Sequence, residues 1–264
     1  MFINPAPTTY NLGGKGYQLS QLSEFCPVPK YFVICFENND EIDSIEIQGE
    51  VIKVFESCGF DYVSVRSSAT VEDSDVASFA GMFTTKLNVH RNNLIKSIKE
   101  VAGSSKNERV NEYCALKGLD AKNIQVRVIV QKMVGSKVSG VCITKDIGNP
   151  DIILIEACWG IGEALVSGMV APDTYKVNRN DYKIESISIG FQKKMVVPFS
   201  SDKIQDVPFH LRNAKKLKEI ELLELCRICL FIENKLSYQI ADIEWAFERD
   251  KLYILQARPF VGRI

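Results

Sequence analysis

Four polar side chains near the C-terminus have the types and spacing that phosphate chemistry needs. Residues 240–259 alternate apolar and polar side chains like two strands joined by a polar turn, which is typical of a β-hairpin. In the register that keeps the apolar side chains on one face, Glu244 lies opposite Gln256 and Asp242 lies opposite Arg258. Carboxylate and amide oxygens suit a hard cation such as Mg²⁺, and a guanidinium suits a phosphate. A solvated face with cross-strand ion pairs explains the same hairpin, so both interpretations stay open at this point.

The apolar residues of this hairpin predict which of its faces is buried. With a polar turn at residues 248–251, six apolar side chains fall on one face: Ile243, Trp245, Phe247, Tyr253, Leu255 and Ala257. We expect this face to pack on a core and the four polar residues to occupy the other face.

A glycine-rich segment near the N-terminus is a candidate anion site. Gly13-Gly14-Lys15-Gly16 precedes a run with helical spacing, residues 17–25. Glycines before a helix let backbone N–H groups approach an anion, and Lys15 adds a positive charge. The segment is not a Walker A loop, because the spacing and the Lys-Ser/Thr ending are missing. A glycine turn with a surface lysine is the alternative.

Two further segments suggest a phosphate clamp and its cover. Arg66 lies in a predicted strand, residues 62–70, that runs into small hydroxyl residues. The segment Ser78–Thr85 is also rich in small residues and leads into a strand at residues 86–89. An arginine followed by a flexible small-residue loop fits a clamp that closes over phosphates. An ordinary Ser/Thr-rich turn is the alternative for either segment.

The spacing of the remaining segments predicts an α+β protein. A β-rich run at residues 124–134 ends in a segment that could present backbone groups to a nucleobase, and later short strands suggest an antiparallel meander. The longest helix is expected at residues 208–234. Its predicted apolar stripe is Leu217, Ile220, Leu223, Cys226 and Leu230.

Composition narrows the class of protein. The formal net charge of −1, from 32 basic and 33 acidic residues, argues against a general nucleic-acid binder or a polybasic membrane protein. We find no apolar run long enough to span a bilayer and no apolar core of a signal peptide in Met1–Asn11. The eight scattered cysteines therefore predict reduced thiols in a cytoplasmic protein. Cys226 and Cys229 form the one close pair, and we expect two thiols in a helix rather than a metal or redox site.

Each segment is a weak signal alone, but their order and spacing together resemble one family. The chain resembles the N-terminal ATP-binding domain of phosphoenolpyruvate synthase, pyruvate phosphate dikinase and the rifampicin phosphotransferases from Leu12 to Pro259. The matching segments are Gly13-Gly14-Lys15-Gly16, Val65-Arg66-Ser67-Ser68-Ala69-Thr70, Ser78-Phe79-Ala80-Gly81, Val130-Gln131-Lys132-Met133-Val134, Ser139-Gly140-Val141, Gly160-Ile161-Gly162-Glu163, Ser167-Gly168, Pro172-Asp173, Asp242-Ile243-Glu244-Trp245 and Leu255-Gln256-Ala257-Arg258-Pro259.

The resemblance implies an α+β, ATP-grasp-like fold in which two subdomains with largely antiparallel sheets hold ATP. We expect an N-terminal subdomain at residues 1–118, which carries the phosphate-covering loop. The C-terminal subdomain, residues 119–264, would carry the adenine hinge and the metal-binding hairpin. By motif match, Lys15 and Arg66 would contact phosphates, and Gly81 and Thr85 would lie on the covering loop. The adenine pocket would be lined by Gln131, Met133 and Val134.

The hairpin would then supply the metal site and much of the catalytic set. The resemblance implies that Glu244 and Gln256 hold Mg²⁺ on the phosphate oxygens. Arg258 would neutralise charge on the transferred group, and Asp242 would orient Arg258 or a metal-bound water. Together with Arg66, these four residues form the expected catalytic set, since positioning and electrostatics dominate phosphoryl transfer.

The acceptor is the open question. Family members pass the phosphoryl group to a histidine in a Gly-Gly-x-Thr-Ser/Cys-His sequence, and neither His90 nor His210 matches it. We therefore expect an ATP-dependent phosphotransferase domain that phosphorylates or pyrophosphorylates a histidine on a separate domain or chain. A stand-alone kinase of a small molecule and a non-catalytic nucleotide-binding module are the alternatives. Neither nucleic acid nor membrane is an expected partner.

Overall fold

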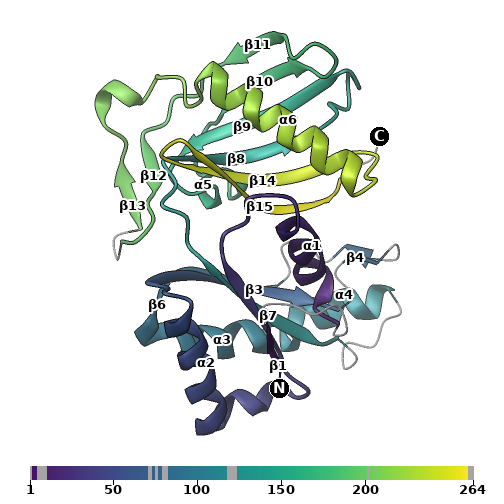
Figure 1. The fold of residues 1–264 in the computed structure, drawn as a ribbon, viewed down its shortest axis with the longest axis vertical. Helices are drawn as coiled ribbons and strands as arrows, with labels where there is room; N and C mark the ends of the chain where they lie inside the picture. The colour runs from purple at the N-terminus through teal and green to yellow at the C-terminus, as the bar shows by residue number, and fades with distance from the viewer. Residues whose placement is uncertain are drawn as a thin grey trace. The chain divides into compact units, whose positions relative to one another are not determined.

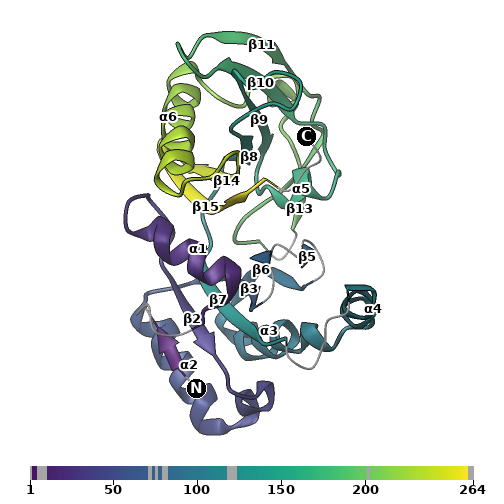
Figure 2. The same cartoon turned by 90° about the vertical axis from the view of Figure 1, so that its right-hand side faces the viewer.

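The chain folds into two compact units with separate cores. The computed structural model describes residues 2–4, 11–70, 73–74, 77–78, 83–117, 124–200 and 203–260. The first unit comprises residues 1–21 and 29–133, and the second comprises residues 22–28 and 134–264. The expected boundary after residue 118 differs from this division, because the strand that follows residue 124 pairs inside the first unit. Figures 1 and 2 show the two units.

The first unit is built on one antiparallel sheet of five strands in the order β1-β2-β7-β3-β6. Its strands are β1 (Phe2–Asn4), β2 (Tyr31–Cys35), β3 (Tyr62–Ala69), β6 (Thr85–His90) and β7 (Val126–Lys132), with the short pair β4 (Asp73–Ser74) and β5 (Ala77–Ser78) beside it in sequence. Its helices are α1 (Gly13–Ser23), α2 (Ile45–Ser57), α3 (Leu94–Ala102) and α4 (Glu108–Lys117), with 3-10 turns at Asn39–Asp43, Arg91–Asn93 and Gly103–Lys106.

Alternation along the strands determines which face of this sheet is buried. Val63 and Val65 of β3 and Val128 and Val130 of β7 belong to one apolar core, together with residues of α2 and α3. Because neighbouring strand residues point to opposite faces, Arg66 on β3 and Gln131 on β7 share the face away from that core. The first unit therefore presents one apolar and one polar face.

The second unit contains a six-stranded antiparallel sheet in the order β11-β10-β9-β8-β14-β15. Its strands are β8 (Val138–Ile143), β9 (Ile152–Trp159), β10 (Asp173–Asn178), β11 (Ile184–Ser188), β14 (Ala241–Glu248) and β15 (Lys251–Pro259). A separate pair is formed by β12 (Lys194–Val196) and β13 (Ile204–Asp206), and the helical segments are α5 (Glu163–Val166), a 3-10 turn (Phe209–Leu211) and α6 (Glu219–Lys235). The expected antiparallel meander is confirmed in β8 to β11.

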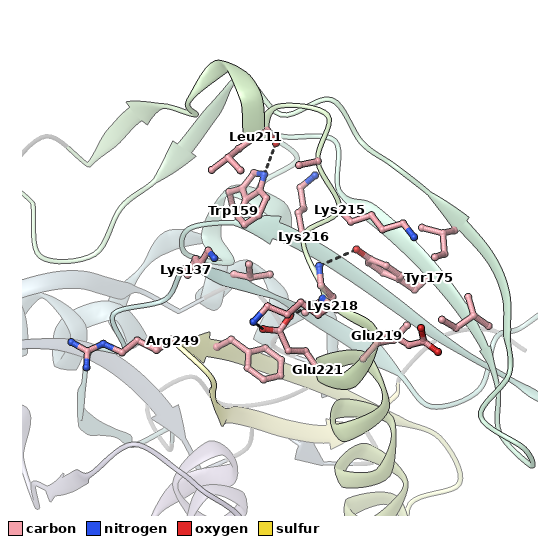
Figure 3. Close-up of a pocket in the computed structure, with 17 residues that line it drawn as sticks. Lys137, Trp159, Tyr175, Leu211, Lys215, Lys216, Lys218, Glu219, Glu221 and Arg249 are labelled. Carbon is pink, nitrogen blue, oxygen red and sulfur yellow. Dashed lines mark hydrogen bonds and ion pairs between the residues drawn. The ribbon is translucent and has the colours of Figure 1, made fainter.

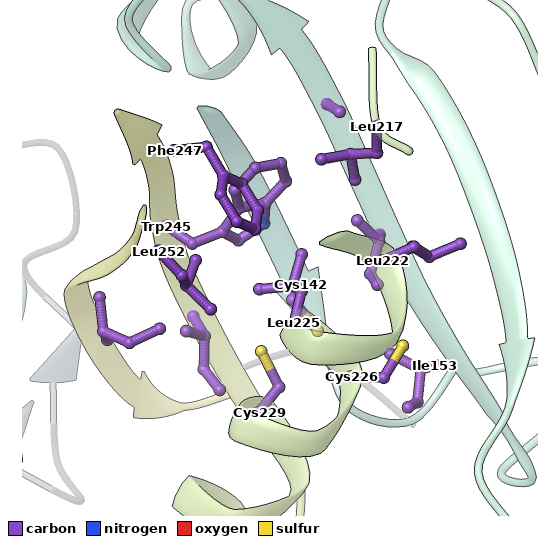
Figure 4. Packing of buried hydrophobic residues seen from close by; sticks show 14 of the residues in the cluster. Cys142, Ile153, Leu217, Leu222, Leu225, Cys226, Cys229, Trp245, Phe247 and Leu252 are labelled. Atoms are coloured by element: carbon purple, nitrogen blue, oxygen red, sulfur yellow. The ribbon is translucent and has the colours of Figure 1, made fainter. Parts of the chain in front are cut away.

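One long helix, α6, covers one face of this sheet (Figures 1 and 2). Figure 4 shows Leu222, Leu225, Cys226 and Cys229 of α6, with Cys226 beside Ile153 of β9. All four belong to one buried cluster with Trp245 and Phe247 of β14. The two cysteines are free and buried, as expected for thiols in a helix, and burial raises the pKa of the Cys226 thiol. Gly140 makes room for the indole, since a Cβ there would lie 2.8 Å from Trp245 Cζ2 and 1.8 Å from the Glu156 carbonyl oxygen.

The helix begins later than the sequence pattern predicts. It starts at Glu219 rather than at residue 208, because the preceding segment is held by Asp173. The Asp173 carboxylate accepts from the Lys216 backbone N–H at 2.9 Å and pairs with Lys216 Nζ at 2.6 Å. The predicted stripe was also wrong in part. Ile220 is 69% exposed, and the buried helix residues are Leu222, Leu225, Cys226, Cys229, Ile232 and Glu233.

Candidate nucleotide site

The hairpin of β14 and β15 has the register that the sequence predicts at its polar positions. Glu244 pairs with Gln256, and Asp242 pairs with Arg258. The two strands meet in a two-residue turn at Arg249 and Asp250. Continued without interruption, the pairing set by this turn would place Glu244 opposite Leu255 instead of Gln256. A bulge corrects this shift. Trp245 pairs with Ile254, so the residue between Ile254 and Gln256 has no partner position on β14.

The bulge overturns part of the predicted apolar face. Ile243, Trp245 and Phe247 are buried in the core as expected. On β15, however, Leu252, Ile254 and Ala257 take the core positions, whereas Tyr253 and Leu255 are only partly buried. Simple alternation had placed Tyr253 and Leu255 in the core because it contained no extra residue.

The polar face of the hairpin contains a tight acid–guanidinium pair. Arg258 donates from Nε and Nη2 to Asp242 Oδ2, at 2.9 and 2.7 Å. Both side chains are partly exposed, at 36% for Arg258 and 17% for Asp242. This confirms the contact expected between the two residues and fixes the direction of the guanidinium. Such a pair at partial exposure stabilises the fold little, about 0–1 kcal/mol, so its position matters more than its strength.

Glu244 and Gln256 place oxygen donors side by side on the same face. They occupy opposite positions on adjacent strands, and Gln256 is 8% exposed. Directly opposed residues of antiparallel strands have Cβ atoms within about 5.5 Å. The described residues contain no cluster of three or more His, Cys, Asp or Glu side chains that could hold a metal. One carboxylate and one amide fit Mg²⁺, which keeps water and phosphate oxygens in its remaining positions.

In the first unit, β3 and β7 bring two of the expected residues into contact. Arg66 Nη1 donates to Gln131 Oε1 at 3.2 Å. Gln131 is 2% exposed, and its Nε2 has no hydrogen-bond partner among the described residues. Thr85 on β6 pairs directly with Arg66, so it shares the same polar face and is exposed there. Gly81 lies outside the described residues.

The glycine segment is tied to the end of β3. Helix α1 begins at Gly13, so Lys15 lies in its first turn rather than before it. The Ser68 hydroxyl accepts from the Gly16 N–H at 2.9 Å and donates to the Leu12 carbonyl at 2.7 Å. Gly13 has φ +73°, and a Cβ there would lie 2.4 Å from the Ser68 carbonyl oxygen. Ser68 therefore anchors the helix start beside the strand that carries Arg66.

Ser68 was not among the predicted site residues. Its place in the run Arg66-Ser67-Ser68 was the available signal, because a hydroxyl two residues after Arg66 lies on the same face of the strand. Its two hydrogen bonds position the start of α1.

The Met133–Val134 segment is only partly available for base recognition. The Met133 N–H donates to the Tyr62 carbonyl at 2.9 Å, so this donor is used inside the first unit. The Val134 carbonyl accepts from the Ser136 N–H at 2.7 Å. The Met133 carbonyl and the Val134 N–H make no hydrogen bond within the described part of the chain. These two groups belong to one trans peptide and point in opposite directions, so a flat ligand on one side meets only one of them.

Both histidines are exposed. His90 ends β6, where its ring lies 5.3 Å from the Tyr62 ring. His210 is exposed in a 3-10 turn.

The chain matches a known protein family over most of its length. Residues 43–262 match the family described as pyruvate phosphate dikinase, AMP/ATP-binding domain. The chain belongs to this family. The matched part of the family is its AMP/ATP-binding domain. The resemblance expected from the sequence is confirmed.

Curated relatives in the dikinase family are much longer than the chain. It is 38% identical over 214 residues to a probable phosphoenolpyruvate synthase from Methanocaldococcus jannaschii, which covers 78% of this chain and 18% of that protein. It is 34% identical over 254 residues to a probable phosphoenolpyruvate synthase from Pyrococcus horikoshii, covering 90% and 31%. A rifampicin phosphotransferase from Bacillus cereus is 35% identical over 210 residues, covering 74% and 23%. The chain therefore spans less than a third of each of these relatives.

The expected α+β class with largely antiparallel sheets is confirmed by the two sheets and their helices. Solved structures similar to the chain include N5-carboxyaminoimidazole synthase from Aspergillus clavatus, at 9% identity and a TM-score of 0.44 over 96% of this chain and 45% of that one. D-alanine–D-alanine ligase from Helicobacter pylori has 12% identity and a TM-score of 0.43, over 95% and 55%. This likeness concerns fold alone. Within the described residues, no helix is long and apolar enough to cross a membrane.

Proposed function

We propose that this chain is the Mg-ATP-binding phosphotransferase domain of a dikinase-type enzyme. It would transfer a phosphoryl or pyrophosphoryl group to a histidine on a separate domain or chain. The observation that carries the proposal is the polar face of the β14–β15 hairpin, where Glu244 and Gln256 pair beside Asp242 and Arg258. Membership of a family named for its AMP/ATP-binding domain supports the same nucleotide.

The first unit would supply the phosphate contacts. Arg66 is aimed along the polar face by its hydrogen bond to Gln131, and a guanidinium in a fixed direction suits a phosphate. Lys15 lies in the first turn of α1, where the helix dipole also favours an anion. Thr85 would carry the base of the covering loop, together with Gly81.

The adenine base would be recognised through Gln131 and the Met133–Val134 segment. The buried Nε2 of Gln131 has no partner among the described residues, and a buried donor without an acceptor costs about 1–3 kcal/mol. A ligand acceptor would remove this cost. Of the segment that follows, the Met133 carbonyl or the Val134 N–H is the group left to contact the base.

The second unit would hold the metal and the transferred group. Glu244 and Gln256 would be the protein ligands of Mg²⁺, which would neutralise charge on the phosphate oxygens when bound. Arg258 would stabilise the negative charge that develops on the transferred group. Its bidentate contact with Asp242 holds the guanidinium in place, so little reorganisation is needed during the reaction. We place this chemistry in the cytoplasm, where Mg-ATP is available.

The acceptor histidine would come from elsewhere. Neither His90 nor His210 lies in the carrier sequence of the family, and the aligned region makes up 18% and 31% of two relatives named probable phosphoenolpyruvate synthase. A carrier domain in trans or in a longer chain would therefore complete the reaction.

A ³¹P NMR experiment tests this function. The protein is incubated with Mg-ATP and the purified histidine-bearing domain of a phosphoenolpyruvate synthase, and the spectra are followed with time. We expect AMP, phosphate and a phosphohistidine signal that depends on both proteins. ADP alone, formed with a small molecule and without the carrier, would point to a stand-alone kinase. ATP bound but never consumed with any carrier would contradict transfer.

A further inference from the structure

The second unit contains a cavity on the opposite side of its sheet from the proposed metal residues. Its volume is about 570 Å³, within the range of small-molecule sites. It lies between the start of α6 and the sheet (Figure 3). Leu222 of the helix and Phe247 of β14 line its wall. Phe247 and Glu244 are three residues apart on β14, so their side chains point to opposite faces. The cavity is therefore distinct from the polar face of the hairpin.

The wall of this cavity is apolar and partly aromatic. Trp159, Tyr175 and Phe247 contribute rings, and Ile184, Ile187 and Leu222 contribute aliphatic side chains. Rings in a wall favour a flat ligand body that can stack or meet them edge to face.

The polar atoms inside the cavity are already used. The Trp159 indole N–H donates to the Leu211 carbonyl at 3.0 Å, and the Tyr175 hydroxyl donates to Asp173 at 2.8 Å. Lys216 is fully buried against Asp173 and also donates to the Gly190 carbonyl at 3.0 Å. A nucleobase would bring donors and acceptors into an interior that has none to spare. An apolar ligand body meets no such cost.

The mouth of the cavity, in contrast, carries positive charge. The Lys137 N–H donates to the Phe247 carbonyl, so the backbones of Lys137 and Arg249 lie at the same end of the sheet. Lys215 lines the cavity from the segment before α6. No carboxylate in the described part of the chain pairs with any of these three cations, whereas Lys218 pairs with Glu221 and Asp250. Glu219 is the single unpaired acid in the wall.

We propose that this cavity binds a small aromatic carboxylate. The ring would lie against Trp159 and Phe247, and the carboxylate would lie at the mouth near Lys137 and Arg249. The apolar interior, whose polar groups are already hydrogen-bonded, favours the aromatic ring of the ligand. The cations without an acidic partner favour its carboxylate. The site does not depend on the proposed nucleotide function, because the two lie on opposite faces of the sheet.

The test compares two probes of nearly the same shape, of which only one is charged. Binding of 2-naphthoate and of 2-naphthamide to the whole protein is measured by isothermal titration. We expect 2-naphthoate to bind at least about tenfold more tightly than 2-naphthamide, because only the acid meets the cations. Saturating Mg-ATP should leave its affinity unchanged. Equal affinity of the two probes, displacement of 2-naphthoate by Mg-ATP, or no binding up to the solubility limit would each overturn the proposal.

Variants locate the site. Lys137→Glu with Arg249→Glu should weaken 2-naphthoate about tenfold or more and leave 2-naphthamide unchanged. Lys53→Glu with Lys96→Glu, two exposed lysines of the first unit, is the matched control with the same change in net charge. Ala214→Trp keeps every charge and should block both probes by filling the cavity. Should Lys137→Glu with Arg249→Glu fail to fold, Lys137→Gln with Arg249→Gln replaces it, and Lys53→Gln with Lys96→Gln becomes the control. Equal weakening in the lysine control would show that bulk charge alone attracts the probe, and would overturn the proposal.

Discussion

Gln131 is the single residue whose contacts bear most directly on ligand binding by the first unit. Its amide is almost fully buried, its oxygen accepts from Arg66, and its nitrogen lacks a partner among the described residues. Buried polar atoms without partners are rare, and a ligand is one of the ordinary explanations. In the proposed function, the same side chain would aim Arg66 and offer a donor to the nucleotide.

Replacing this amide separates ligand binding from stability. We expect Gln131→Leu to weaken ATP binding about tenfold, or about 1.4 kcal/mol, because both the donor and the support of Arg66 are lost. The melting temperature should change little, since the substitution also removes an unsatisfied buried donor. Isothermal titration and a thermal melt measure the two effects.

A second glutamine of the same unit supplies the control. Gln125 also contacts an arginine, with its Oε1 2.7 Å from Arg127 Nη2, but it is exposed. Gln125→Leu should leave ATP affinity unchanged. Loss of stability without loss of affinity in Gln131→Leu would mean that Gln131 is a structural residue only.

At the scale of elements, the start of α1 and the end of β3 act as one piece. Ser68 bonds both the Gly16 N–H and the Leu12 carbonyl, and Gly13 allows the close approach. Lys15 and Arg66 are therefore carried by elements that are fixed to each other within the first unit. A phosphate contact made by both residues requires this rigidity.

Ser68→Ala tests that coupling. The substitution leaves the buried Gly16 N–H and Leu12 carbonyl without their shared partner, which should cost about 1–3 kcal/mol of unfolding free energy. We also expect ATP binding to weaken, because Lys15 is no longer held beside β3. Urea denaturation and ATP titration measure both effects.

Ser57 offers a comparison of the same chemical type. Its hydroxyl donates to the Val54 carbonyl at 2.8 Å on the exposed end of α2. Ser57→Ala should change neither quantity noticeably. An unchanged ATP affinity in Ser68→Ala, at temperatures where the variant is folded, would contradict the positioning role of Ser68.

The elements also show what the sequence could and could not predict. Alternation placed Glu244 opposite Gln256 correctly, because a wrong register would have buried charge. It could not place the bulge at Leu255, because a bulge is a local insertion that leaves the polar pairs intact. The start of α6 was missed for a different reason. The buried ion pair of Asp173 and Lys216 fixes the preceding segment, and a contact over 43 residues leaves no local pattern.

At the scale of the whole molecule, each unit has its own core and its own polar face. Val63, Val65 and the helices α2 and α3 build the first core, and α6 packed on Trp245 and Phe247 builds the second. The predicted phosphate residues belong to the first unit, as do Gln131 and Met133 of the predicted adenine set, whereas Val134 and the predicted metal residues belong to the second. The family motifs identified these residues, because composition and periodicity alone left a solvated hairpin as an equal alternative.

The chain covers only part of the length of its relatives. It aligns with 18% and 31% of the two phosphoenolpyruvate synthases described above. ATP binding is expected from this chain by itself, whereas turnover is expected only with a histidine carrier. Binding is therefore the quantity that tests the central claim without a partner.

The most direct measurement is the affinity of ATP with and without Mg²⁺ for the wild type and Glu244→Gln. The substitution keeps the shape of the side chain and removes the negative charge that would hold the metal. We predict that Mg²⁺ strengthens ATP binding to the wild type and that this gain is largely lost in Glu244→Gln. Glu185→Gln, on the exposed part of β11, should behave as the wild type. An equal effect of Mg²⁺ on the wild type and Glu244→Gln would contradict the assignment of the hairpin as the metal site.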